Sequence, residues 1–248
     1  MKRRALIIGA PGDGVRNTYL SGVEIDVSEY RRYLMSPLGG AWRADEIVTL
    51  DSPSEARLIT EIERLAEADY SFTTFSGHGF HESNKNSTHV EIQPHKYFDA
   101  ALLRDGAPKH TLVLDCCRAV ETLTLLEASM DSLVKKAQKL DPSDCRRYFD
   151  ERISQCAKGL VELNACSIGE SALDLQGRGG LYSSSLIRGA IEWELHQVVD
   201  TAKKYRIFSV SLAHSNAEKA VRSHSRNRQN PLIDQPRSEK QFPFGIIA

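Results

Sequence analysis

Two apolar segments of the chain each end in residues that can carry nucleophilic chemistry. The β-rich segment 70–76 runs into His78, which stands between two glycines, and a second apolar segment, 112–114, runs into an acid and two cysteines, of which Cys117 is the last. Parallel strands place their carboxyl ends at the same edge of a sheet, where α/β folds hold their active sites. A thiol becomes a strong nucleophile when a histidine within hydrogen-bond reach takes its proton. The sequence therefore predicts a Cys–His nucleophilic site.

Each of these residues alone has a plainer interpretation. A single histidine after a strand is more often structural, and a cysteine at a strand end is more often a buried thiol. Zinc binding by His78, His81, Cys116 and Cys117 is disfavoured because adjacent strand residues point to opposite faces. The joint placement at two strand ends favours the nucleophilic site, in which backbone N–H groups near Gly79 and Cys117 would face an oxyanion.

The composition indicates an ordinary globular chain. It has 248 residues with 41% hydrophobic content and a net charge of -1, which allows one domain over 1–248 and gives no global basic excess for nucleic acid. No apolar run approaches the roughly 18 residues of a membrane span, and the apolar run at 5–10 is too short for a signal peptide. Five cysteines with irregular spacing fit a reducing compartment. We expect a cytoplasmic protein that binds neither membrane nor nucleic acid.

The hydrophobic periodicity predicts strands that alternate with helices, so the expected fold class is α/β with a mostly parallel sheet covered on both faces. The predicted strands are Ala5–Ala10, Ile47–Leu50, Tyr70–Ser76, Thr111–Cys116, Leu160–Cys166 and Phe242–Ile247. The predicted helices are Ser21–Leu34, one opened by Ser52–Ser54, one opened by Pro94 with Phe98, Leu102 and Leu103 inward, Tyr182–Leu195 and Val210–Val221; Ser223–Lys240 is predicted to be a long loop.

Residues 119–158 have a different pattern from the rest of the chain. Apolar residues recur every three or four positions with Lys and Glu between them, which predicts one amphipathic helix, a break at Asp141–Ser143 and a second helix. This helical insertion is either a regulatory or partner-binding element or a plain crossover between strands, and the sequence favours neither.

Glycines at positions 9, 12 and 14 follow the first strand. A phosphate-binding loop would need a Gly-Lys-Ser/Thr ending or the glycine spacing of a dinucleotide fold, and the segment has neither. A flexible loop beside an active-site rim is the plainer interpretation.

The motifs Ser-Gly-His-Gly at 76–79 and Asp-Cys-Cys at 115–117, each closing a strand, resemble the caspase/metacaspase clan of cysteine peptidases. The similarity extends over most of the chain, through segments at 5–9, 20–27, 165–172 and 229–231. This resemblance implies a three-layer sandwich around a six-stranded sheet, with the helical insertion 119–158 after the strand that carries the nucleophile. It implies that Cys117 is the nucleophile and His78 the general base and acid, with Gly79 in the oxyanion site and Cys116 packed into the sheet.

The resemblance also implies an acidic pocket for the residue before the cleaved bond. The positions that match this pocket are Asp26, Ser76 and Asp115. Two carboxylates in a narrow pocket bind Arg or Lys and reject Asp. The plainer interpretation of Asp26 is an acid on the solvent face of a helix.

Two departures from the family pattern stand out. Most metacaspases carry His-Ser-Gly after the nucleophile, whereas residues 118–120 are Arg-Ala-Val, and the acidic cluster that binds calcium in many of them is not recognisable. We therefore expect no metal or other cofactor. The dibasic pairs Lys135-Lys136 and Arg146-Arg147 are candidate self-cleavage sites.

The sequence thus predicts a cysteine endopeptidase that cleaves protein or peptide substrates after Arg or Lys and is controlled by a partner, a ligand or self-processing. By resemblance to stand-alone prokaryotic members, roles in stress or antiphage cell death are implied. The alternatives are a non-catalytic caspase-like scaffold and a signal-binding module that uses the loop at 9–14.

Overall fold

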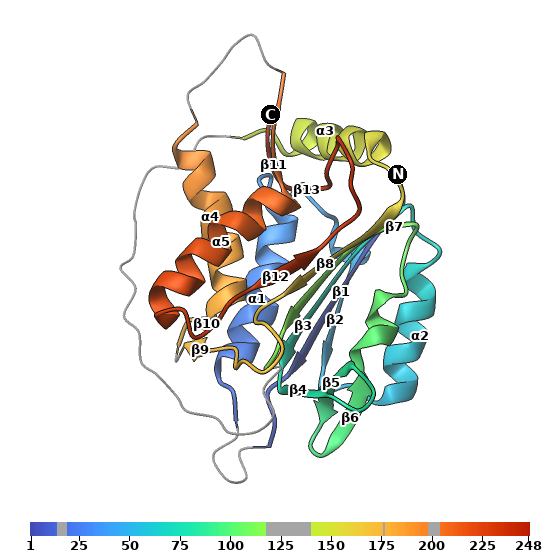
Figure 1. Cartoon of the computed structure of the whole chain (residues 1–248). Helices are drawn as coiled ribbons and strands as arrows, with labels where there is room; N and C mark the ends of the chain where they lie inside the picture. The colour runs from blue at the N-terminus through green and yellow to red at the C-terminus, as the bar shows by residue number, and fades with distance from the viewer. Residues whose placement is uncertain (14–18, 118–139, 176, 198–203) are drawn as a thin grey trace.

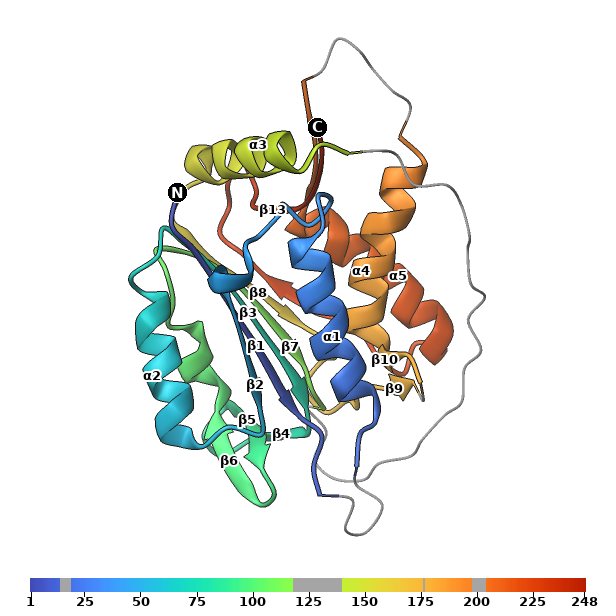
Figure 2. The same cartoon turned by 180° about the vertical axis from the view of Figure 1, so that it is seen from behind.

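The computed structural model describes residues 1–13, 19–117, 140–175, 177–197 and 204–248 (Figures 1 and 2). The helices are α1 (Gly22–Met35), α2 (Glu55–Leu65), α3 (Pro142–Gln155), α4 (Leu181–Leu195) and α5 (Val210–Ser225), with short 3-10 helices at Ala44–Glu46 and Ala100–Arg104. The strands are β1 (Arg3–Ala10), β2 (Ile47–Asp51), β3 (Tyr70–Gly77), β4 (Gly79–Glu82), β5 (Ser87–Gln93), β6 (Lys96–Asp99), β7 (Lys109–Asp115), β8 (Gly159–Asn164), β9 (Asp174–Leu175), β10 (Gly179–Gly180), β11 (Arg206–Ser209), β12 (Leu232–Asp234) and β13 (Pro243–Ile247).

A six-stranded sheet of order β12-β8-β7-β3-β1-β2 forms the centre of the molecule. Every pair is parallel except β12 with β8. Helices α1, α4 and α5 cover one face, and α2 with the small sheet β4-β5-β6 covers the other (Figures 1 and 2). Strand β3 is buried along its whole length, its Ser and Thr residues included, because both faces of the sheet are covered. The predicted three-layer α/β fold with a mostly parallel six-stranded sheet is confirmed.

The sixth strand of the sheet is not the one that the sequence predicted. Residues 232–234, in the segment expected to be a loop, form β12 and pair antiparallel with β8. The predicted strand 242–247 exists as β13, but it pairs with β11 in a separate two-stranded sheet. A three-residue edge strand is too short to leave a pattern in the sequence, and strand partners are set by tertiary packing.

The helix predicted to open at Pro94 is wrong. Residues 96–99 form β6, paired with β5, and only a 3-10 helix follows at 100–104. Asp99 caps that short helix by accepting the N–H of Ala101, and Leu102 is exposed rather than inward. Cross-strand pairing with β5 overrode a helical spacing of only three apolar residues.

The second helix of the predicted insertion is α3, which Asp141 caps by accepting the N–H groups of Ser143 and Asp144. The first predicted helix and the pair Lys135-Lys136 lie outside the described residues. The other dibasic pair lies within α3, and Arg146 is held by Glu46 with N···O of 2.5 Å. A peptidase binds its substrate in an extended form, so this pair is not presented for cleavage in this structure.

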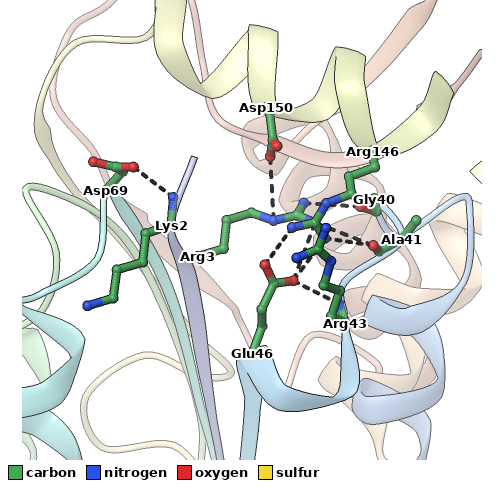
Figure 3. Close-up of polar contacts among 9 residues, drawn as sticks. All are labelled: Lys2, Arg3, Gly40, Ala41, Arg43, Glu46, Asp69, Arg146 and Asp150. Carbon is green, nitrogen blue, oxygen red and sulfur yellow. Dashed lines mark hydrogen bonds and ion pairs between the residues drawn. The ribbon is translucent and has the colours of Figure 1, made fainter. Parts of the chain in front are cut away.

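A buried arginine, Arg3, ties α3 to the start of the sheet (Figure 3). Its side chain has no exposed surface and lies 3.4 Å from Asp150 and 3.6 Å from Glu46. It donates to the carbonyl of Gly40 at 3.0 Å and stacks on the Trp42 ring at 4.6 Å. Burial lowers the pKa of Arg3 to about 10, so it stays charged at neutral pH.

We expect Arg3→Ala to destabilise the fold by about 3–5 kcal/mol, because it removes the buried cation next to Asp150 and leaves Arg146 alone to balance Glu46. Urea unfolding of the two proteins measures this difference. Lys2→Ala is the matched control, because the Lys2–Glu67 pair is more than half exposed on both sides and should contribute less than about 1 kcal/mol. Equal losses for the two variants would contradict this role of Arg3.

Candidate active site

The register of the two central strands brings the predicted dyad together. In the parallel pair β3–β7, Ser76 lies opposite Asp115, and His78 and Cys117 each follow two residues later. Both residues therefore follow the carboxyl edge of the sheet at the same level of the register. The N–H of Glu91 on β5 donates to the His78 carbonyl at 3.0 Å, which fixes the backbone there.

Gly79 packs directly against the chain that follows β7. A Cβ at this position would stand 2.9 Å from the Cys116 sulfur and 3.0 Å from the Cys117 carbonyl oxygen, so only glycine allows this approach. The cysteine Cys116 is 1% exposed and lies in the core on the α2 side, in the packing role expected for it.

The Cys117 thiol lies against the backbone of the segment at 172. It is partly exposed, and its sulfur donates to the carbonyl of Ala172 at 3.5 Å. Burial raises the pKa of Cys117, and the negative charge of Asp115 raises it further. A thiol of this kind is a poor nucleophile until a base takes its proton.

The segment that touches the thiol is anchored by the chain near its carboxyl end. Fully buried Gln229 donates to the carbonyl of Ala165 at 2.9 Å and accepts the N–H of Leu173 at 3.1 Å. Asn230 donates to Glu170 through its backbone and its side chain, both at 2.7 Å. Ala165, Glu170, Gln229 and Asn230 belong to the segments 165–172 and 229–231, which resemble the caspase/metacaspase clan. Their contacts show that each of these segments holds the other in place.

The three predicted pocket residues lie close together at the carboxyl ends of β3 and β7. Asp26 lies on α1, Ser76 on β3 and Asp115 at the end of β7, and the Ser76 hydroxyl donates to Asp26 at 2.5 Å. The residue between the two acids is Gly180, because a Cβ there would stand 2.4 Å from Asp115 and 3.1 Å from Asp26. Asp26 is therefore not the solvent-facing acid of the plainer interpretation.

Both carboxylates bind the start of α4. The N–H of Gly180 donates to both oxygens of Asp26 at 3.0 Å, and the N–H of Ser183 donates to Asp115 at 2.9 Å. The first N–H groups of a helix lack partners within the helix and favour negative charge. This explains how two acids are tolerated side by side, at 3% and 5% exposure.

Burial shifts the titration of both acids. It raises the pKa of Asp115 to about 6, and it raises the pKa of Asp26 well above its usual range, where the charge of Asp115 adds to the effect. Like charges close together in a dry site resist ionisation, so one of the pair binds a proton at mildly acidic pH.

A third acid, Asp174 on β9, escaped the sequence interpretation. Its carboxylate accepts the N–H of Gly22 at 3.2 Å, and a Cβ on Gly22 would overlap it. Burial raises its pKa, and the charge of His78 opposes that rise. Asp174 lies two residues after Ala172, the last residue of the motif at 165–172. This proximity to the motif is the feature of the sequence from which Asp174 could have been proposed.

A cavity of about 310 Å³ opens between α1 and α4 beside this cluster. Asp26 lines it, whereas Ser76 and Asp115 do not. The N–H groups of Gly180 and Ser183 contact Asp26 and Asp115 in this structure, and Gly180 lies between the two carboxylates.

The remaining sequence candidates have structural roles in the described part of the chain. A Cβ on Gly9 would meet Val27 at 2.7 Å, so this glycine lets α1 pack on β1; the loop that follows it lies partly outside the described residues. His81 is buried, with Nδ1 3.4 Å from the Thr88 hydroxyl. Among the described residues, no group of three or more His, Cys, Asp or Glu could hold a metal ion. No described helix is long and apolar enough to cross a membrane.

The chain belongs to the caspase domain family of cysteine peptidases, whose family model matches residues 2–243. Among curated proteins no sequence matches it. Two solved structures show the same fold at low identity. Protein GSU0716 from Geobacter sulfurreducens has 16% identity and a TM-score of 0.61, with 100% of both chains covered. Caspase-1 from Spodoptera frugiperda has 10% identity and a TM-score of 0.59, with 98% of this chain and 90% of that chain covered.

Proposed function

We propose that this protein is a cysteine endopeptidase that uses a Cys117–His78 dyad and cleaves after Arg or Lys. The observation that carries the proposal is the β3–β7 register, which sets His78 and Cys117 at one level of the sheet edge directly above two buried carboxylates. Membership of the caspase domain family supports the same chemistry.

In the proposed reaction His78 takes the thiol proton and the Cys117 sulfur attacks the carbonyl carbon of the scissile peptide bond. The carbonyl oxygen becomes an oxyanion beside Gly79, whose N–H is the proposed donor. When the C–N bond breaks, His78 returns the proton to the leaving amine, and a thioester remains on Cys117. Water then attacks the thioester with His78 again as base, which releases the acid product and the free thiol.

The proposed specificity rests on charge. Asp26 and Asp115 approach one another in a dry site, where a guanidinium or ammonium group would relieve their mutual repulsion. Asp174 adds a third carboxylate at the rim, near Gly22. An aspartate side chain would meet three acids and be rejected.

The contacts of the thiol and of the acids support regulation. The thiol donates to Ala172, and the N–H groups of Gly180 and Ser183 contact the acids, so the proposed active form requires movement of the segment at 172 and of the turn at 177–180. An activating partner, a ligand or self-processing would supply it. A cytoplasmic location belongs to this proposal because of the cysteine content. A part in stress or antiphage cell death belongs to it through the family resemblance alone.

Hydrolysis of fluorogenic peptides that end in Arg, Lys or Asp tests the proposal directly. We expect turnover after Arg and Lys and at least about 100-fold less after Asp, since one charge reversal in a buried pocket costs several kcal/mol. Preference for Asp would refute the acidic pocket and retain the peptidase. If every peptide is inert and a thiol-directed probe fails to label Cys117, the non-catalytic scaffold becomes the better description.

A further inference from the structure

A second cavity, of about 440 Å³, lies across the sheet edge from the acid cluster. It is lined mainly by polar side chains of β4, β5, the 3-10 helix at 100–104 and β8. Its lining includes Lys85, Asp99, Arg104 and Glu162, together with Leu114 of β7.

This cavity and the acid cluster lie on opposite faces of the same strand. Leu114 and Cys116 belong to the core on the α2 side, whereas Asp115 contacts the start of α4 on the other face. Cys117 stands at the edge between the two faces. A peptide that crosses this edge with its Arg or Lys in the acid cluster directs the residues after the cleaved bond towards the second cavity.

The length of chain between Cys117 and the second cavity determines which residue of the bound peptide reaches that cavity. Leu114 precedes Cys117 by three positions, which corresponds to about 10 Å of extended chain. The second or third residue after the bond spans a similar length.

The acids of the cavity are already satisfied by the protein. Asp99 accepts the Ser87 hydroxyl at 2.5 Å and the N–H of Ala101 at 2.9 Å. Glu162, with only 6% of its side chain exposed, accepts from Arg104 at 2.7 Å and from Asn164 at 3.0 Å.

The cations have donors to spare. Arg104 is 54% exposed, and its contacts with Glu162 use Nε and Nη2 and leave Nη1 for a ligand. Lys85 is 67% exposed and meets Glu82 at 3.2 Å in a surface pair of the weak kind. The unmet hydrogen-bonding capacity of the cavity is therefore that of a carboxylate receptor.

We propose that this cavity binds an acidic side chain at the second or third position after the cleaved bond. The inference rests on the proposed endopeptidase function, because it needs a peptide seated across Cys117. It makes Lys85 and Arg104 specificity-determining residues of the same site.

The test measures binding to the full-length Cys117→Ala chain by fluorescence anisotropy. Three labelled peptides share one sequence with Arg before the bond and carry Glu, Ala or Lys at the second and third positions after it. We expect the Glu peptide to bind about five-fold more tightly than the Ala peptide, with the Lys peptide weakest. Lys85→Glu should abolish or reverse this order, and it lies on an exposed turn where folding is tolerant.

Two further variants make the test specific. Lys96→Glu introduces the same charge change on β6, outside the cavity, and should keep the wild-type order. Arg104→Gln with Glu162→Gln removes the second cation without stranding the buried acid, and should also flatten the order. Equal binding of the three peptides to the parent chain, or no binding of any of them, overturns the proposal.

Cleavage of a coumarin peptide, which has no amino acid after the bond, separates this proposal from the one on which it rests. Turnover of that substrate by the unmodified chain together with equal binding of the three peptides refutes the cavity and keeps the peptidase. Preferential binding of the Glu peptide, with no turnover and no labelling of Cys117 by a thiol-directed probe, supports the cavity and refutes the catalytic proposal.

Discussion

Replacement of Cys117 by Ala is expected to abolish peptide hydrolysis, with a loss of at least about 10³-fold in kcat. The substitution removes the atom that forms the thioester, and nothing else in a dyad mechanism substitutes for a nucleophile. Initial rates on the best Arg or Lys peptide measure the loss.

The adjacent cysteine is the matched control. Cys116→Ala removes the same sulfur from the next residue, but that side chain is 1% exposed and packs into the core on the α2 side. We expect a loss of about 1 kcal/mol in stability and retention of most of the turnover. Equal inactivation of the two variants would contradict the assignment of Cys117.

The second large effect concerns Asp115. Asp115→Asn should lower kcat/KM about 100-fold for Arg and Lys peptides, because a buried partner charge contributes about 2–5 kcal/mol. Glu24→Gln is a matched loss of charge at an exposed position of α1 and should leave the specificity unchanged. Equal kinetics for Asp115→Asn and the parent on Arg peptides would remove Asp115 from the pocket.

The same substitution should make the protein more stable at neutral pH. The folded pKa of Asp115, about 6, lies above its ordinary value of 3.8, so the folded state favours the protonated acid. Below pH 4 the ionisation of Asp115 does not lower the free energy of unfolding. The loss of stability grows between pH 4 and 6 and is complete above pH 6. Asparagine retains an oxygen that accepts the N–H of Ser183.

We therefore expect Asp115→Asn to raise the free energy of unfolding by about 2 kcal/mol at pH 7 and by much less at pH 4. Urea unfolding at the two pH values measures both numbers. A variant that is less stable than the parent at pH 7 would show that the hydrogen bond from Ser183 outweighs the cost of the buried charge. Loss of activity with gain of stability is the signature of an acid kept for function.

The principal strands, and the positions of the proposed dyad residues at one sheet edge, were predictable from local sequence. Runs such as 5–10 and 112–114 are apolar without alternation, as expected of a strand covered on both faces. Because these strands are parallel, the chemical groups that follow them had to meet at one edge. His78 and Cys117 were therefore identifiable before any tertiary contact was known.

The acid cluster contains contacts that local sequence does not predict. Its members come from α1, β3, β7 and β9, and their surroundings are set by the start of α4. Family resemblance pointed to Asp26, Ser76 and Asp115, but Asp174 and the cover formed by Gly180 depend on how a glycine-rich turn folds back against α1. No periodicity records such a contact.

The sequence by itself determined the strongly patterned helices and strands and the residues at their ends. Burial of one or both faces of an element requires apolar residues at fixed positions, and this pattern is visible in the sequence. Tertiary structure alone decided that 232–234 completes the main sheet and that 243–247 pairs with β11 in a separate sheet. It also decided that the segment at 171–172 contacts the Cys117 thiol. These outcomes depend on pairing between segments far apart in the chain. Their energies come from packing and hydrogen bonds that exist only once the sheet has formed.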